Sequence, residues 1–119
     1  MIRRFATAVL CASLSACNAA QAPGPAASSA PTASAYANLP AGVSPPGFRL
    51  PDGAGCAGAV ARYTAIMDND LNSGHTSQSV YDRIKGEIAQ ASAACSAGRE
   101  AEAEGLIRAS KARHGYPQG

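Results

Sequence analysis

CAGAVARYTAIMDNDLNSGHTSQSVYDRIKGEIAQASAAC, residues 56–95, decides the fold of this chain. In its first half, apolar side chains recur three or four residues apart, at Cys56, Val60, Tyr63, Met67 and Leu71. The second half repeats this spacing at Tyr81, Ile84, Ile88, Ala91 and Cys95. Each pattern is the single stripe of an amphipathic helix. Gly74 between them suits the end of a helix, and Ser79 with Asp82 three residues later forms a variant of the capping box. We therefore predict a helical hairpin whose second helix has Ser79 as its N-cap.

A third helix is predicted from about Arg99 to Gly115. Acidic residues lead it and basic residues end it, an order that suits the helix macrodipole: Glu100, Glu102, Glu104, then Arg108, Lys111, Arg113. Gly98 ends the helix before it, while Gly115, Tyr116 and Pro117 form a stop signal. Its inner face is Ala103, Leu106, Ile107 and Ser110. The sequence thus predicts an all-α domain over residues 52–119, a hairpin plus a third helix forming a three-helix bundle.

Residues 1–16 are organised like a secretory signal peptide. Arg3 and Arg4 precede an uncharged apolar run from Phe5 to Leu14, which small residues follow. The run is too short to span a bilayer, which takes about 20 apolar residues in a helix. We interpret it as a targeting segment that is not a permanent anchor.

The end of this segment, Leu14-Ser15-Ala16-Cys17, resembles the lipobox of bacterial lipoprotein precursors. The resemblance implies cleavage before Cys17, a thioether-linked diacylglycerol on its sulfur, and acylation (as with palmitate) of the new amino terminus. More than one acyl chain gives stable anchoring. Asn18 after the cysteine, by resemblance to enterobacterial sorting, favours the outer membrane, with the protein facing the periplasm. The alternative is an ordinary signal peptide cut elsewhere. The helical part resembles no family to which we can attach an activity.

Residues 17–51 have the composition of a linker. Seven of the eight prolines lie here, among Ala, Ser, Gly and Gln, and no charged residue occurs between Arg4 and Arg49. Such a segment has too little apolar surface to offset the entropy of ordering. We predict a disordered, lipid-anchored spacer; a proline-rich ligand for another protein is the weaker alternative.

The cysteines test this arrangement. The chain has four; under the lipoprotein resemblance Cys11 leaves with the signal and Cys17 carries lipid. Cys56 and Cys95 remain, in an exported chain that favours their oxidation. They lie at equal distances from the turn at His75–Thr76, so an antiparallel hairpin brings them together. We predict a Cys56–Cys95 disulfide, against the alternative of two free thiols or a metal pair.

Little in the sequence points to catalysis, metal binding or nucleic-acid binding. Neither His75 nor His114 has partners at zinc-ligand spacing, and both are interpreted as solvated or capping residues. The run Asp68–Gly74 resembles the start of a calcium loop, but lacks its glycine and its bidentate glutamate. Without Arg3 and Arg4, 10 − 2 = 8 basic residues face 8 acidic ones, a balance unlike that of a nucleic-acid binder. We predict no catalytic residue, no metal site and no cofactor.

The function expected from these features is that of a non-catalytic envelope lipoprotein presenting a small helical interaction domain on a flexible tether. The alternative is a periplasmic inhibitor or protective protein for an envelope enzyme or toxin; an enzyme or metal carrier comes third. The expected partners are the membrane, through Cys17, and an unidentified protein. The candidate partner-binding residues lie on the third helix: Leu106, Ile107, Arg108 and Lys111. The alternative is that this helix only completes the bundle.

Overall fold

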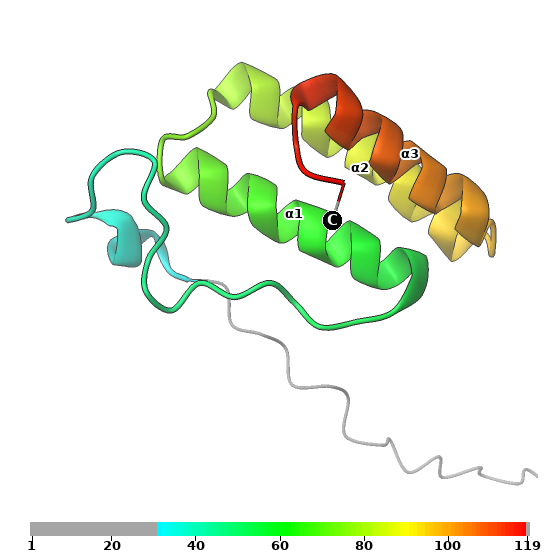
Figure 1. Cartoon of the computed structure of the whole chain (residues 1–119), viewed down its shortest axis with the longest axis horizontal. Coiled ribbons are helices and arrows are strands. Elements are labelled where there is room, and N and C mark those ends of the chain that lie inside the picture. Colours follow the sequence, from blue (N-terminus) through cyan, green and yellow to red (C-terminus); the bar gives the residue numbers. More distant parts are fainter. Residues whose placement is uncertain (1–30, 119) are drawn as a thin grey trace, which may run out of the picture.

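The computed structural model describes residues 31–118, and within this range every regular element is helical (Figure 1). A 3-10 turn, η1, spans Ala33–Tyr36, followed by α1 (Gly55–Asn72), α2 (Gln78–Ser96) and α3 (Glu100–His114). The three α-helices contact one another pairwise, which confirms the predicted all-α bundle. The predicted signal peptide, Cys17 and the first part of the predicted linker lie outside the described residues.

The core forms where the three predicted apolar stripes meet. Its main cluster consists of six buried side chains, namely Tyr63, Met67, Ile84, Ile88, Ala91 and Ile107. Burying a large aliphatic side chain stabilises a fold by about 1.5–3 kcal/mol relative to leaving it exposed. Because each helix contributes to the cluster, no two of them form the core alone.

The helix ends follow their capping residues, with one correction to the sequence prediction. Gly74 (φ +75°) and Gly115 (φ +75°) adopt the left-handed conformation just after α1 and at the end of α3. The prediction of Ser79 as the N-cap of α2 is wrong, because the helix begins at Gln78. Its N-cap is Ser77, whose Oγ accepts a hydrogen bond of 3.4 Å from the Val80 N–H. The Tyr81 N–H already donates to the Ser77 carbonyl, 3.0 Å away, so the backbone ladder starts two residues earlier than the capping-box pattern indicated.

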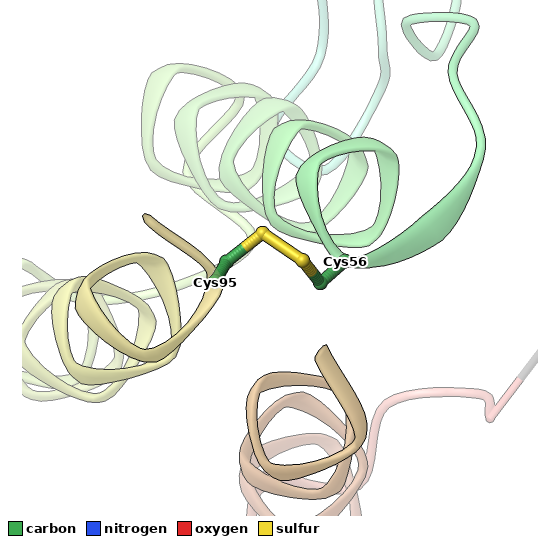
Figure 2. The surroundings of a disulfide bond; sticks show 2 residues. All are labelled: Cys56 and Cys95. Atoms are coloured by element: carbon green, nitrogen blue, oxygen red, sulfur yellow. A yellow bond between two sulfur atoms is a disulfide. The ribbon is translucent and has the colours of Figure 1, made fainter. Parts of the chain in front are cut away.

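The Cys56–Cys95 disulfide is present and joins the first turn of α1 to the last turn of α2 (Figure 2). The two Cα atoms are 5.8 Å apart, within the usual range for a disulfide. Cys56 packs with Ala94 and Ala103 in a second small cluster, so α3 covers the bridge. The disulfide therefore closes the open end of the hairpin, as the sequence predicted.

Residues 31–51, assigned to the linker on composition, lie along α1 in the structure (Figure 1). The Gly42 N–H donates to the Ser73 carbonyl, 2.6 Å away, and Asn69 Nδ2 donates to Ser44 Oγ at 2.7 Å. Pro45 is buried. This ordering differs from the predicted spacer because it depends on individual hydrogen bonds and on one buried proline. Apolar periodicity plays no part in it.

No helix among residues 31–118 combines the length and the apolar character needed to cross a membrane.

Candidate functional site

The four candidate partner-binding residues of α3 have different environments. Ile107 is only 4% exposed and belongs to the core, so it is not part of an accessible surface. Leu106 is half-buried and packs against both apolar clusters. Arg108 is exposed and Lys111 is half-buried, with its Nζ 5.7 Å from the centre of the Tyr63 ring. Of the partner-binding surface predicted from sequence, only Arg108, Lys111 and part of Leu106 are therefore accessible.

A set of interactions not foreseen from the sequence is centred on three consecutive residues, Asp68-Asn69-Asp70, near the end of α1. Each accepts a hydrogen bond from a tyrosine of a different segment. Tyr36 donates to Asn69 Oδ1 (3.1 Å), Tyr81 of α2 to Asp68 Oδ1 (2.8 Å), and Tyr116 after α3 to Asp70 Oδ2 (2.8 Å). The run that resembled a calcium loop therefore ties all the other segments to α1.

Burial, hydrogen bonding and nearby carboxylates raise the pKa of all three tyrosines. The hydrogen bond to Asp68, aided by burial, raises the pKa of Tyr81. Burial, followed by the hydrogen bond to Asp70, raises the pKa of Tyr116 well above its ordinary value. Burial and the nearby charges of Asp68 and Asp70 raise the pKa of Tyr36. All three hydroxyls therefore remain protonated at neutral pH, so each can act as the donor in its hydrogen bond.

A groove of about 650 Å³ lies next to this junction, between the ordered segment before α1 and the surface of α1 and α2. We call it the α1 groove. Three aromatic side chains line it, Tyr36, Phe48 and Tyr81, together with small residues of α1 such as Ala61 and Ala65. Its volume falls within the range of small-ligand and peptide-anchor sites, about 300–1,000 Å³. The wall that contains Tyr36 and Phe48 comes from the stretch that composition assigned to the linker, so sequence reasoning missed the groove.

The polar edge of the α1 groove contains both signs of charge. Lys85 Nζ lies 3.5 Å from Asp68 Oδ1 and 5.6 Å from the centre of the Tyr81 ring. Asp68 accepts from Tyr81 as well, so its carboxylate is already engaged. Arg49, on the opposite wall, is exposed and forms no ion pair with any residue from 31 to 118. The uncompensated charge along the groove is therefore positive.

A second polar cluster joins α2 to α3. Glu87 Oε2 lies 3.1 Å from Arg113 Nη2 and 3.3 Å from His114 Nε2. Burial alone would raise the pKa of Glu87, but its interactions with Ser110, Arg113 and His114 outweigh burial and lower it. The interpretation of His114 as solvated or capping is therefore wrong, since its side chain is only 14% exposed and contacts this carboxylate. His75 is exposed in the turn.

The remaining chemistry of residues 31–118 is sparse. This part of the chain holds no group of three or more His, Cys, Asp or Glu side chains placed to bind a metal. The contacts of Glu87 with Arg113 and His114 join α2 to α3. The α1 groove, with its aromatic wall held by hydrogen bonds, is the feature best suited to binding another molecule. No family model, curated protein or solved structure matches this chain.

Proposed function

We propose that this chain is a bacterial envelope lipoprotein that is lipidated on Cys17 and presents a non-catalytic recognition domain. Its proposed location is the outer membrane, with the domain facing the periplasm. The lipobox-like sequence supports the anchor. The Cys56–Cys95 disulfide supports export, because such bridges persist in oxidising compartments and are rare in the cytosol of most bacteria.

The recognition surface in this proposal is the α1 groove, and its occupant is an extended segment of a partner protein. The observation that carries the proposal is that one wall of the groove is fixed before any partner binds. Tyr36 is held by Asn69, and Ser44, which precedes the wall residues Phe48 and Arg49 in the same segment, is held by the same side chain. A surface ordered in advance loses less conformational entropy on binding, which favours affinity.

The charge and shape of the groove indicate the kind of segment. Arg49 adds positive charge at one wall, while Phe48 and Tyr36 offer apolar and aromatic contact. An extended segment with apolar side chains and at least one acidic residue matches this lining, since complementary charge gives specificity and speeds association. If the protein is instead an inhibitor, the same surface binds the partner, and the partner's activity falls on binding.

The anchor is tested by metabolic labelling with a fatty acid and by detergent-phase separation of the wild-type chain and of Cys17→Ser. We expect label and detergent partitioning in the wild type, and in the variant no label and a soluble or unprocessed product. Equal labelling of Cys17→Ser would overturn the lipoprotein proposal.

The recognition surface is tested by photo-crosslinking in intact cells. A photoreactive residue placed at Ala65, which lines the groove, is compared with one at Ala101, which is exposed on α3. We expect a discrete cross-linked protein from the first position only, lost when Arg49→Glu is added. Equal products from both positions, or a product insensitive to Arg49→Glu, would refute the groove as the recognition surface.

A further inference from the structure

Three basic side chains from two helices surround a small hollow on the face of the bundle where α1 meets α3. Arg62 of α1 and Arg108 and Lys111 of α3 line this hollow, whose volume is about 190 Å³. The other residues of its lining are Ala59, Glu104, Ile107 and Gln118. The α3 pair was noticed in the sequence, but Arg62 joins it only through the packing of the two helices.

The charges around the hollow are poorly compensated. Arg62 donates to the Gly53 carbonyl, and Lys111 lies over the Tyr63 ring, so the groups they contact carry no net charge. Within residues 31–118 neither of these two cations has a carboxylate within 4.0 Å. Arg108 Nη1 is 3.9 Å from Glu104 Oε2, with both side chains largely exposed, and such a surface pair contributes little. Among residues 31–118, Glu104 is thus the one residue whose carboxylate lies within 4.0 Å of any of these three cations.

The donors at this hollow fit an oxyanion. An arginine guanidinium presents several N–H groups in a fixed plane that matches phosphate oxygens, and a lysine adds a compact charge. Arg62 uses one of its donors on Gly53, which orients the guanidinium while leaving other N–H groups for a ligand. Ala59 and Ile107 supply the apolar part of the lining.

We propose that Arg62, Arg108 and Lys111 form a binding site for a phosphate group, the headgroup phosphate of an anionic phospholipid in the cell. The lipid source rests on the proposed anchoring of the chain to a membrane, whereas the phosphate chemistry rests on the three side chains alone. Binding would seat the bundle on the bilayer with the α1–α3 face toward the lipid. The α1 groove, lined by α1, α2 and the segment before α1, opens on a different face of α1.

The test uses the whole chain carrying Cys17→Ser, which prevents acylation, and every variant carries the same change so that any vesicle binding through residues 1–16 is common to all of them. The probes are inorganic phosphate, vesicles of phosphatidylcholine alone, and the same vesicles with phosphatidylglycerol. The variants are Lys111→Gln and Arg62→Gln, with Arg83→Gln on the exposed surface of α2 as the matched control. Circular dichroism checks that each variant is folded; because Arg62 also holds Gly53, Lys111→Gln gives a second measurement at the same hollow.

We expect binding to the phosphatidylglycerol vesicles that weakens with salt, and little binding to phosphatidylcholine. Lys111→Gln and Arg62→Gln should each weaken it roughly fivefold, the effect of one basic residue near an anionic surface, while Arg83→Gln should not. Saturable binding of inorganic phosphate without vesicle binding would support the phosphate site but refute a phospholipid as its ligand. Absence of both, or an equal loss in Arg83→Gln, would refute the site. Fatty-acid labelling of the wild-type chain, measured separately, distinguishes these results from failure of the proposed anchor.

Discussion

Loss of the Cys56–Cys95 disulfide is expected to lower the free energy of unfolding by about 4 kcal/mol, because the reduced chain gains freedom when it unfolds. The bridge spans a sequence separation of 39 residues. In the chain-entropy model, closing a loop of that length removes about 13 cal/mol/K from the unfolded ensemble, which corresponds to about 4 kcal/mol at 25 °C.

This magnitude is comparable to the stability that the core itself supplies. A single small core rarely supplies more than about 3–5 kcal/mol, and the main buried cluster here holds only six side chains. The second cluster, around Cys56, consists of small residues that contribute little apolar area. The reduced protein should therefore keep only the stability that the core supplies, about half of that of the oxidised protein.

The assay is urea denaturation of the oxidised protein, the protein in reductant, and the double variant Cys56→Ala/Cys95→Ala, followed by far-UV circular dichroism. The reduced protein and the variant should both lose the same large fraction of stability, and reductant should not affect the variant. A difference between oxidised and reduced protein below about 1 kcal/mol would refute the reasoning. It would mean that helix packing alone, without the bridge, holds the bundle together.

Three further predictions concern caps and titration. Ser77→Ala should destabilise the domain by about 1 kcal/mol, whereas Ser79→Ala should have little effect. If thermal unfolding showed the larger loss of stability for Ser79→Ala, Ser79 would be the N-cap after all. The lowered pKa of Glu87 means that its contribution is complete above its ordinary pKa of 4.5 and is lost as the pH falls below it. Glu87→Gln should therefore make the loss of stability at acidic pH less steep, and an unchanged loss would contradict this prediction. The raised pKa of Tyr116 gives stability that is present below pH 10.0 and lost as the pH rises further. Tyr116→Phe should cost about 1 kcal/mol at neutral pH and make the alkaline loss less steep, as urea titrations at neutral and alkaline pH will show.

The helices and the disulfide could be predicted because repeating patterns determine them. Tyr63, Met67, Ile84 and Ile88 recur at helical spacing, and burial of one face follows directly from that spacing. The N-cap was predicted at Ser79 and lies at Ser77, because both serines come just before the apolar stripe. Local pattern does not decide between two serines that can each serve as a cap.

The α1 groove and the tyrosine junction could not be predicted because they depend on pairings between distant residues. Tyr36 lies 33 residues from Asn69, and Tyr116 lies 46 residues from Asp70. The sequence offered one signal, since three adjacent side-chain acceptors occur in a chain with four tyrosines. Nothing in one sequence says which tyrosine meets which acceptor. The same holds for Arg62, which reaches the α3 basic residues only through helix packing.

Glycine at position 58 offers the sharpest test of whether the segment before α1 belongs to the folded domain. A Cβ added there would overlap the Gly53 carbonyl, which lies against α1 at that point. Gly86, in the interior of α2, has open space where such a Cβ would lie. Overpacking usually costs about 1–3 kcal/mol, whereas alanine for glycine in an open helix position gains about 0.5–1 kcal/mol.

We therefore expect Gly58→Ala to destabilise the domain and Gly86→Ala to stabilise it, although both changes add one methyl group to a helix. Hydrogen exchange gives a local readout, because the Gly42 amide is protected only while its segment is bound to Ser73. In Gly58→Ala this amide should exchange faster, while amides in the middle of α2 change less. If Gly58→Ala were as stable as Gly86→Ala and kept the Gly42 amide protected, the close approach of Gly53 to α1 would not exist in solution. The wall of the α1 groove would then have to be reconsidered along with it.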